Sequence, residues 1–250
     1  MDPVSLLNQQ YTNPQVIQAY SAVGLFPAEE KLIDKYFTAG STILDVGCGA
    51  GRTAIPLAQK GYRVVGIDLM PKMIAAARQQ ASAHQVKIDF IVMDVVHMPF
   101  LKHSFQNVFF AYNGFEQIPG KSNRQQALQN LFDVLAPGGC CILTTRSGLG
   151  VGRRTLGWMI MALTYSYQHF ISQAERPIGF GDKLWGDMYC HYLSPFHVKK
   201  SSERIGFLLL EFNSEKNVLN DKSSSILTNF SNDRILFYVL RKKLTCSTGK

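Results

Sequence analysis

The chain has 250 residues, of which 46% are hydrophobic, and it carries a net charge of +8. This length suits one large α/β domain or two small ones, and the apolar content is enough for a buried core. No uninterrupted apolar run of about 18 residues occurs, and no basic stretch precedes an apolar one at the N-terminus, so neither a membrane span nor a secretory signal is expected. The five cysteines lack CxxC or Cys/His spacing, which favours reduced thiols in the cytoplasm and no metal site.

The N-terminal part, residues 1–40, is predicted to form a helical cap. Its segment Asn8–Tyr36 has a helical pattern that Pro14 and Pro27 interrupt. Tyr20 is prominent there, either packing on the neighbouring sheet or covering a bound ligand.

The segment Thr42–Leu69 carries the most information. An apolar run ends in the glycine-rich turn Gly47–Gly51, a helical pattern begins near Arg52, and a second apolar run ends on Asp68. The glycines allow a sharp turn and close approach of a ligand, and the helix N-terminus suits a carboxylate or phosphate. A carboxylate at the tip of the second strand can accept both hydroxyl hydrogens of a ribose. This unit predicts a site for a nucleoside-containing ligand at the carboxyl edge of a parallel sheet.

Three more strand signals follow along the chain, at Phe90–Asp94, Val108–Tyr112 and Cys140–Thr145, the last after the turn Leu135–Gly139. Over Ser41–Arg146 the sequence resembles the class I S-adenosylmethionine-dependent methyltransferases. It departs from the family pattern at Asn107, where an aspartate is common. The resemblance implies an α/β, Rossmann-like, doubly wound sheet of seven mostly parallel strands. The last strand is then antiparallel and lies between its neighbours.

The resemblance also implies that S-adenosylmethionine is the cofactor and that residues 41–146 are the half that binds it. In the family, the acidic position matched by Asp94 contacts the adenine amino group. The predicted cofactor contacts are Asp45, Gly47, Gly49, Gly51, Arg52, Asp68, Leu69, Asp94, Val95, Ala111 and Tyr20.

The remaining elements extend the same single domain, 1–250. Helices are predicted at Met70–Ala83, Arg124–Leu135 and Ser194–Phe207, and the last two strands at Leu208–Phe212 and Ile235–Arg241. Residues 147–193 interrupt this pattern as an insertion, with a loop at Pro177–Trp185 and a short extended piece at Cys190–Leu193. Residues 194–250 complete the domain, with Asn213–Asn232 as a loop.

Leu156–Phe170, inside the insertion, is a strongly apolar helical segment that is too short to span a bilayer. It has three interpretations: a lid over the substrate, a homodimer interface, or an anchor on a membrane surface. The lid is favoured because the insertion borders the carboxyl ends of the fourth and fifth strands.

Methyl transfer from a sulfonium needs an aligned acceptor and exclusion of water rather than a metal or a protein nucleophile. An oxygen or protonated amine acceptor also needs a general base, for which His191 is the first candidate, with His97 as another. Asn113, Glu116, Arg146 and Tyr192 are predicted to face the substrate, and Arg146 suits an acidic one.

The first functional hypothesis is a methyltransferase acting on an O, N or C atom of a small molecule. The second is an RNA methyltransferase, because residues 151–250 hold 14 of the 26 basic and 8 of the 18 acidic residues, and Gly181–Tyr192 loosely resembles a segment of transfer-RNA wobble-uridine enzymes. The third is a non-catalytic module that binds S-adenosylmethionine. DNA bases are disfavoured, because Ala111–Glu116, AYNGFE, lacks the [DNS]-P-P-[YF] pattern.

Overall fold

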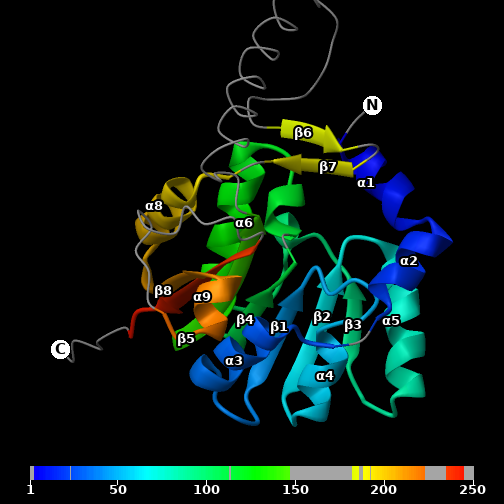
Figure 1. Cartoon of the computed structure of the whole chain (residues 1–250), viewed down its shortest axis with the longest axis horizontal. Helices are drawn as coiled ribbons and strands as arrows, with labels where there is room; N and C mark the ends of the chain where they lie inside the picture. Colours follow the sequence, from blue (N-terminus) through cyan, green and yellow to red (C-terminus); the bar gives the residue numbers. More distant parts are fainter. Residues whose placement is uncertain are drawn as a thin grey trace, which may run out of the picture.

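The computed structural model describes residues 3–22, 24–112, 114–146, 182–185, 188–191, 193–222 and 235–244. A twisted sheet forms the middle of the molecule, with helices on both of its faces (Figure 1). The apolar segment Leu156–Phe170 and most of the predicted insertion lie outside the described residues.

The sheet has seven strands in the order β3-β2-β1-β4-β5-β9-β8. Their bounds are β1 Thr42–Val46, β2 Arg63–Asp68, β3 Asp89–Val92, β4 Phe105–Phe110, β5 Leu135–Arg146, β8 Phe207–Ser214 and β9 Ile235–Lys242. The strands from β3 to β5 are parallel, and β9 runs antiparallel to both of its neighbours. The predicted fold class and the antiparallel last strand between its neighbours are therefore confirmed.

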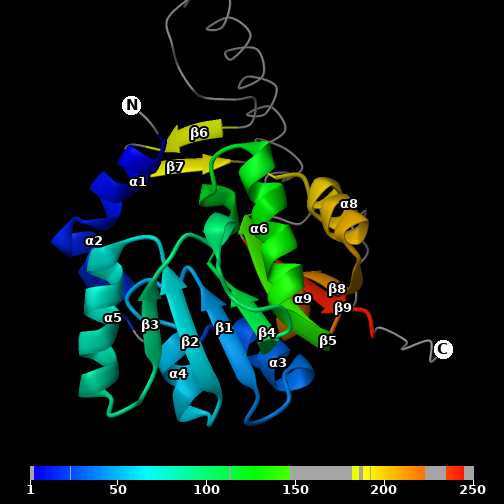
Figure 2. The ribbon, with the colours of Figure 1, turned by 180° about the vertical axis from the view of Figure 1, so that it is seen from behind.

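Two apolar cores lie on the two faces of the sheet. Successive residues of β5 alternate between them, with Cys140 and Ile142 in one core and Cys141 and Leu143 in the other, as expected for a strand covered on both sides. The helices α3 (Pro27–Tyr36), α4 (Ala54–Gln59), α5 (Pro71–Ala83) and α9 (Glu215–Leu219) belong to the first core. The helices α6 (Lys121–Val134) and α8 (Pro195–Ile205) belong to the second, and Figure 2 shows α6 on the opposite face from α3 and α4.

Two N-terminal helices, α1 (Pro3–Tyr11) and α2 (Pro14–Tyr20), lie beyond the carboxyl edge of the sheet (Figure 1). The break between them is fixed by Asn13, whose side chain accepts a hydrogen bond from the Gln15 amide at 2.9 Å and caps α2. The predicted helical pattern over Asn8–Tyr36 is thus three helices separated at the prolines.

Two predicted loops are wrong in part. Asp182–Trp185 is strand β6, which pairs antiparallel with β7 (Met188–His191), because the glycine-rich start of the predicted loop hid a short strand at its end. Glu215–Leu219 is helix α9, begun by the Ser214 hydroxyl accepting from the Asn217 amide. In the part of the chain that the structure describes, no helix has the length and apolar character needed to cross a membrane.

Candidate functional site

A cavity of about 190 Å³ opens at the carboxyl edge of the sheet, beside the ends of β1, β2 and β4. Strand order reverses between β1 and β4, and such a reversal is where open α/β sheets bind ligands. Of the predicted cofactor contacts, those on the cavity wall are Gly47, Gly49, Arg52, Asp68, Leu69, Asp94, Val95, Ala111 and Tyr20. The other two, Asp45 and Gly51, lie outside the wall.

The turn after β1 keeps the cavity open. Gly47 and Gly49 have φ angles of 64° and 54°, which favour glycine. A Cβ atom on Gly47 would lie 3.3 Å from the Phe110 ring, whereas one on Gly49 would meet nothing within 4 Å. The backbone of Gly49 therefore borders free space that a ligand can fill. A Cβ atom on Gly51 would instead lie 3.1 Å from the Ile55 side chain, so Gly51 belongs to the packing below the turn.

Asp68, at the end of β2, holds this turn in place. Its Oδ2 atom accepts a hydrogen bond from the Gly49 amide at 2.9 Å, and its Oδ1 atom accepts one from the Met70 amide at 2.8 Å. Burial raises the pKa of this carboxyl, and the two amide bonds act in the opposite direction. A carboxylate has about four acceptor positions, so two remain for hydroxyl groups of a ligand in the cavity.

Asp45 lies behind the turn. Its side chain is buried and accepts a hydrogen bond from the Thr53 hydroxyl at 2.6 Å. Burial raises its pKa to about 7, and the Thr53 bond and the Arg52 charge lower it. In this structure Asp45 links β1 to the start of α4 at Ala54, and its predicted contact with the cofactor stays a prediction.

Asp94 lies beyond the end of β3 and caps the 3-10 helix η1 (Val95–His97). Its Oδ1 atom accepts from the Val96 amide at 2.8 Å, and its Oδ2 atom lies 3.1 Å from Nδ1 of His97. Met93, Val95 and Val96 contribute apolar surface to the cavity next to this carboxylate. A polar group beside an apolar wall suits a flat heteroaromatic ring that carries an amino group.

Aromatic rings from the N-terminal helices close the other side of the cavity. Tyr11, Tyr20 and Tyr112 lie on the wall and form a chain of edge-to-face contacts, with ring centroids 5.6 and 5.7 Å apart. Phe26 continues the chain with its ring 5.8 Å from Tyr112. Tyr20 therefore packs on other aromatic rings and borders the cavity, and its contact with the cofactor stays a prediction.

Arg52 joins the glycine turn to α3 through a buried ion pair. Its two terminal nitrogens contact the two carboxylate oxygens of Glu29 at 2.9 and 2.8 Å, and one of them also donates to the Gly24 carbonyl at 2.9 Å. The guanidinium stacks on Phe26 and Tyr112, at 4.5 and 5.3 Å from the ring centroids. The arginine thus supplies positive charge to the cavity wall while it is held in a fixed position.

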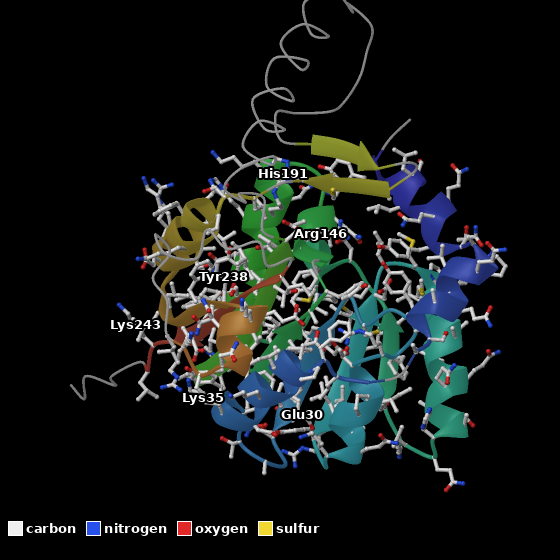
Figure 3. All side chains as sticks on the ribbon, viewed as in Figure 1. Glu30, Lys35, Arg146, His191, Tyr238 and Lys243 are labelled. Atoms are coloured by element: carbon white, nitrogen blue, oxygen red, sulfur yellow. The ribbon has the colours of Figure 1, made fainter. Side chains whose placement is uncertain are left out.

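The residues predicted to face the substrate are dispersed. Glu116, in the 3-10 helix η2 (Gly114–Gln117), is buried, and Arg146 is half-buried at the end of β5. Burial raises the pKa of Tyr20, and the charge of Arg146 is one of the smaller opposing effects, so its field reaches the cavity. His191 lies at the end of β7, outside the cavity wall. Figure 3 shows Arg146 and His191 on the side of the sheet where the β6–β7 hairpin lies.

Two predicted substrate residues, Asn113 and Tyr192, lie outside the described residues. His97, the alternative base, is exposed and paired with Asp94. Sequence reasoning missed much of the apolar wall, which includes Leu7, Met70, Met73, Met93 and Phe110, and it also missed the polar Gln117. Met93 directly follows β3, and Met70 lies two residues after the end of β2, so strand-end position was a usable signal for them. Leu7 comes from α1, and nothing in its local pattern indicates that it reaches the cavity.

Glu116 is a buried carboxyl group near the site, and its pKa is shifted. Burial raises its pKa to about 8 from an ordinary 4.5, opposed by the Arg146 amide and charge and by the nearby Leu193 amide. Its Oε1 atom is buried and has no hydrogen-bond partner among the described residues. Folding therefore favours the protonated form. This contribution to stability is fully present below about pH 4.5 and is lost as the pH rises through about 8.

We therefore expect Glu116→Gln, which mimics the neutral acid, to remove this part of the pH dependence. The free energy of unfolding of the variant, relative to the wild type, should rise between about pH 5 and about pH 8. Urea denaturation at several pH values measures it, and Asp45 titrates identically in both proteins. A difference that is constant across this range would contradict the raised pKa.

Comparison with known proteins adds to this geometry. Residues 43–139 match the family model of a methyltransferase domain. This segment of the chain is therefore similar to methyltransferase domains. The matched residues contain β2 to β4, all of β1 but its first residue, the glycine turn, Asp68 and Asp94, which build the side of the cavity that the sheet provides.

The methyltransferase relatives are similar to about half of the chain. A ubiquinone biosynthesis O-methyltransferase of Rickettsia canadensis is 30% identical over 53% of this chain and 57% of its own length. A demethylmenaquinone methyltransferase of Thermus thermophilus is 37% identical over 40% of this chain and 45% of its own. The chain thus spans about half the length of the curated relatives it matches.

A solved methyltransferase from Methanosarcina mazei shares the fold, with a TM-score of 0.63 and 22% identity over 89% of this chain and all of that one. This likeness covers the sheet and its helices as a whole. Arg146 and β7 follow residue 139 and so lie outside the segment that the family model matches.

Proposed function

We propose that this chain binds S-adenosylmethionine in the cavity and transfers its methyl group to a small-molecule acceptor. The observation that carries the proposal is the pairing of Asp68 with the open glycine turn. The carboxylate keeps two acceptor positions for ribose hydroxyls, and the space above Gly49 is free. These acceptor positions suit the ribose of the cofactor, and the free space above the turn suits the part of the cofactor that lies beside it.

The cofactor contacts that we propose are residues that line the cavity. Asp68 accepts hydrogen bonds from the ribose, and Asp94 with Val95 and Val96 takes the adenine. The backbone at Gly47 and Gly49 and the charge of Arg52 lie toward the amino-acid part. When bound, the cofactor supplies an electrophilic methyl group. The protein's own contribution is to orient donor and acceptor and to keep water out.

The acceptor proposed is a small, partly apolar molecule with an anionic group. The cavity wall on the side of the N-terminal helices is aromatic. The positive charge of Arg146 acts on Tyr20 in this wall. Two relatives are named for ubiquinone biosynthesis and for demethylmenaquinone, which agrees with a small aromatic acceptor. His191 stays our proposed proton acceptor for a hydroxyl substrate, on its sequence position and its place beyond the carboxyl edge.

A methyl-transfer assay with radiolabelled cofactor tests the acceptor class. The protein is incubated with cell extract, which is then divided into small-molecule, RNA and protein fractions, and Asp68→Ala serves as the inactive control. We expect the label in the small-molecule fraction. Label in RNA alone would overturn the acceptor class, and cofactor binding without any label would indicate a non-catalytic module.

A further inference from the structure

The short helix η2 lies between the cavity and the elements that cover it. It follows β4, and its last two residues, Glu116 and Gln117, send their side chains to different covering elements. Gln117 lies on the cavity wall, and Glu116 is buried behind it with 2% of its surface exposed.

Gln117 holds the N-terminal helix. Its Nε2 atom donates a hydrogen bond of 2.6 Å to the Tyr11 hydroxyl, at the end of α1. Tyr11 and Leu7 of the same helix line the cavity. The bond joins residues 106 positions apart in the chain, so it fixes a segment that local structure does not position.

Glu116 holds the opposite side of the cover. Its Oε2 atom accepts from the Arg146 amide, at the end of β5, at 3.0 Å. The Leu193 amide, two residues after β7, also stabilises its charge. Strand β7 packs against η2 as well as against α1.

The two sides of the cover meet at Tyr189. This residue of β7 is 1% exposed and packs in one apolar cluster with Leu7 and Tyr11 of α1, together with Met70 and Met73 below. The cover is therefore a continuous layer of α1 and β7 over the cavity, and η2 is hydrogen-bonded to α1 and packs against β7. Figure 1 shows α1 next to β7 beyond the carboxyl edge of the sheet.

We infer that Glu116 and Gln117 are positioning residues that clasp α1 and β7 over the cofactor cavity, and thereby set how fast the cofactor and its product exchange. The inference rests on the proposed function for the identity of the ligand. In this inference Glu116 holds the cover over the cavity, whereas the sequence predicted that it faces the methyl acceptor.

A clasp has a kinetic signature that a lost ligand contact lacks. The clasp joins two side chains of the protein itself, so breaking it opens the cavity for entry as well as for exit. Gln117→Ala and Tyr11→Phe should each raise the association and dissociation rate constants of S-adenosylhomocysteine by roughly two- to tenfold. The dissociation constant should change much less. The double variant should be no faster than either single one, because both remove the same hydrogen bond.

The matched control is Gln126→Ala, because Gln126 donates a similar bond, 2.9 Å to Asn130, on the exposed surface of α6. It should leave both rate constants unchanged. For the second arm, Glu116→Ala should accelerate exchange, and Glu116→Gln, which keeps an oxygen for the Arg146 amide, should restore much of the wild-type rate.

Hydrogen exchange of the α1 amides, measured by mass spectrometry without ligand, tests the clasp independently. We expect faster exchange of α1 in Gln117→Ala and Tyr11→Phe but not in Gln126→Ala. Unchanged α1 exchange, or a rise in the dissociation rate constant alone, would overturn the clasp. A wild-type protein that does not bind S-adenosylhomocysteine would instead contradict the proposed function, and the exchange of α1 would still decide whether the clasp exists.

Discussion

Asp68→Ala is expected to weaken S-adenosylmethionine binding at least tenfold. Hydrogen bonds to a charged group contribute roughly 1.5–3 kcal/mol each, and the variant loses those to the ribose. It also releases the Gly49 and Met70 amides that the carboxylate now accepts from, so the turn loses its fixed shape. Titration calorimetry measures the dissociation constant.

The control for this variant is Asp89→Ala, because Asp89 is exposed at the start of β3, on the opposite edge of the sheet. It should bind like the wild type. Circular dichroism establishes that Asp68→Ala is folded at the temperature of the titration. A folded Asp68→Ala protein with an unchanged dissociation constant would remove Asp68 from the site.

Arg52→Ala should cost about 3–5 kcal/mol of unfolding free energy, because it leaves the Glu29 carboxylate buried without its partner. The Glu29 side chain is 2% exposed and that of Arg52 is 13% exposed, so little water reaches the pair. The stacking of the guanidinium on Phe26 and Tyr112 is lost as well. Urea denaturation near neutral pH measures the loss.

Two further variants separate burial from charge. Lys60→Ala breaks ion pairs to Glu30 and Asp34 on the surface, and such exposed pairs contribute at most about 1 kcal/mol. The double variant Glu29→Met with Arg52→Met replaces both charges with apolar groups and should recover most of the stability. It should not recover cofactor binding, because Arg52 lies on the cavity wall. An Arg52→Ala loss no larger than that of Lys60→Ala would contradict the buried clamp.

The fold was predictable because its signals are local and repeated. The first three parallel strands, β1 to β3, are short apolar runs with a glycine or an acidic residue at or just after the end, and Asp68 and Asp94 are two of these residues. The pairing of β9 between β5 and β8 came from the family resemblance, since no local pattern specifies it. The errors arose where a few residues decide the structure, as in Asp182–Trp185, where pairing with β7 determines the strand.

The walls of the cavity also differ in how far the sequence predicts them. The wall built by strand ends and the glycine turn was predictable from residue type and position. The wall built by α1 was not, because Leu7 and Tyr11 reach the cavity through contacts with Tyr189 and Gln117, which are distant in sequence. The burial of Glu116 likewise depends on the end of β5 and on Leu193, so it could not be predicted from the local sequence, and its contact with the substrate stays a prediction.

A crystal structure of the protein with S-adenosylhomocysteine would test the central claim most directly. The account predicts the ribose hydroxyls within hydrogen-bond distance of the Asp68 carboxylate, the adenine beside Asp94 and Val95, and the amino-acid part over Gly47 and Gly49. A ligand bound elsewhere, or one in the cavity whose ribose does not contact Asp68, would contradict it.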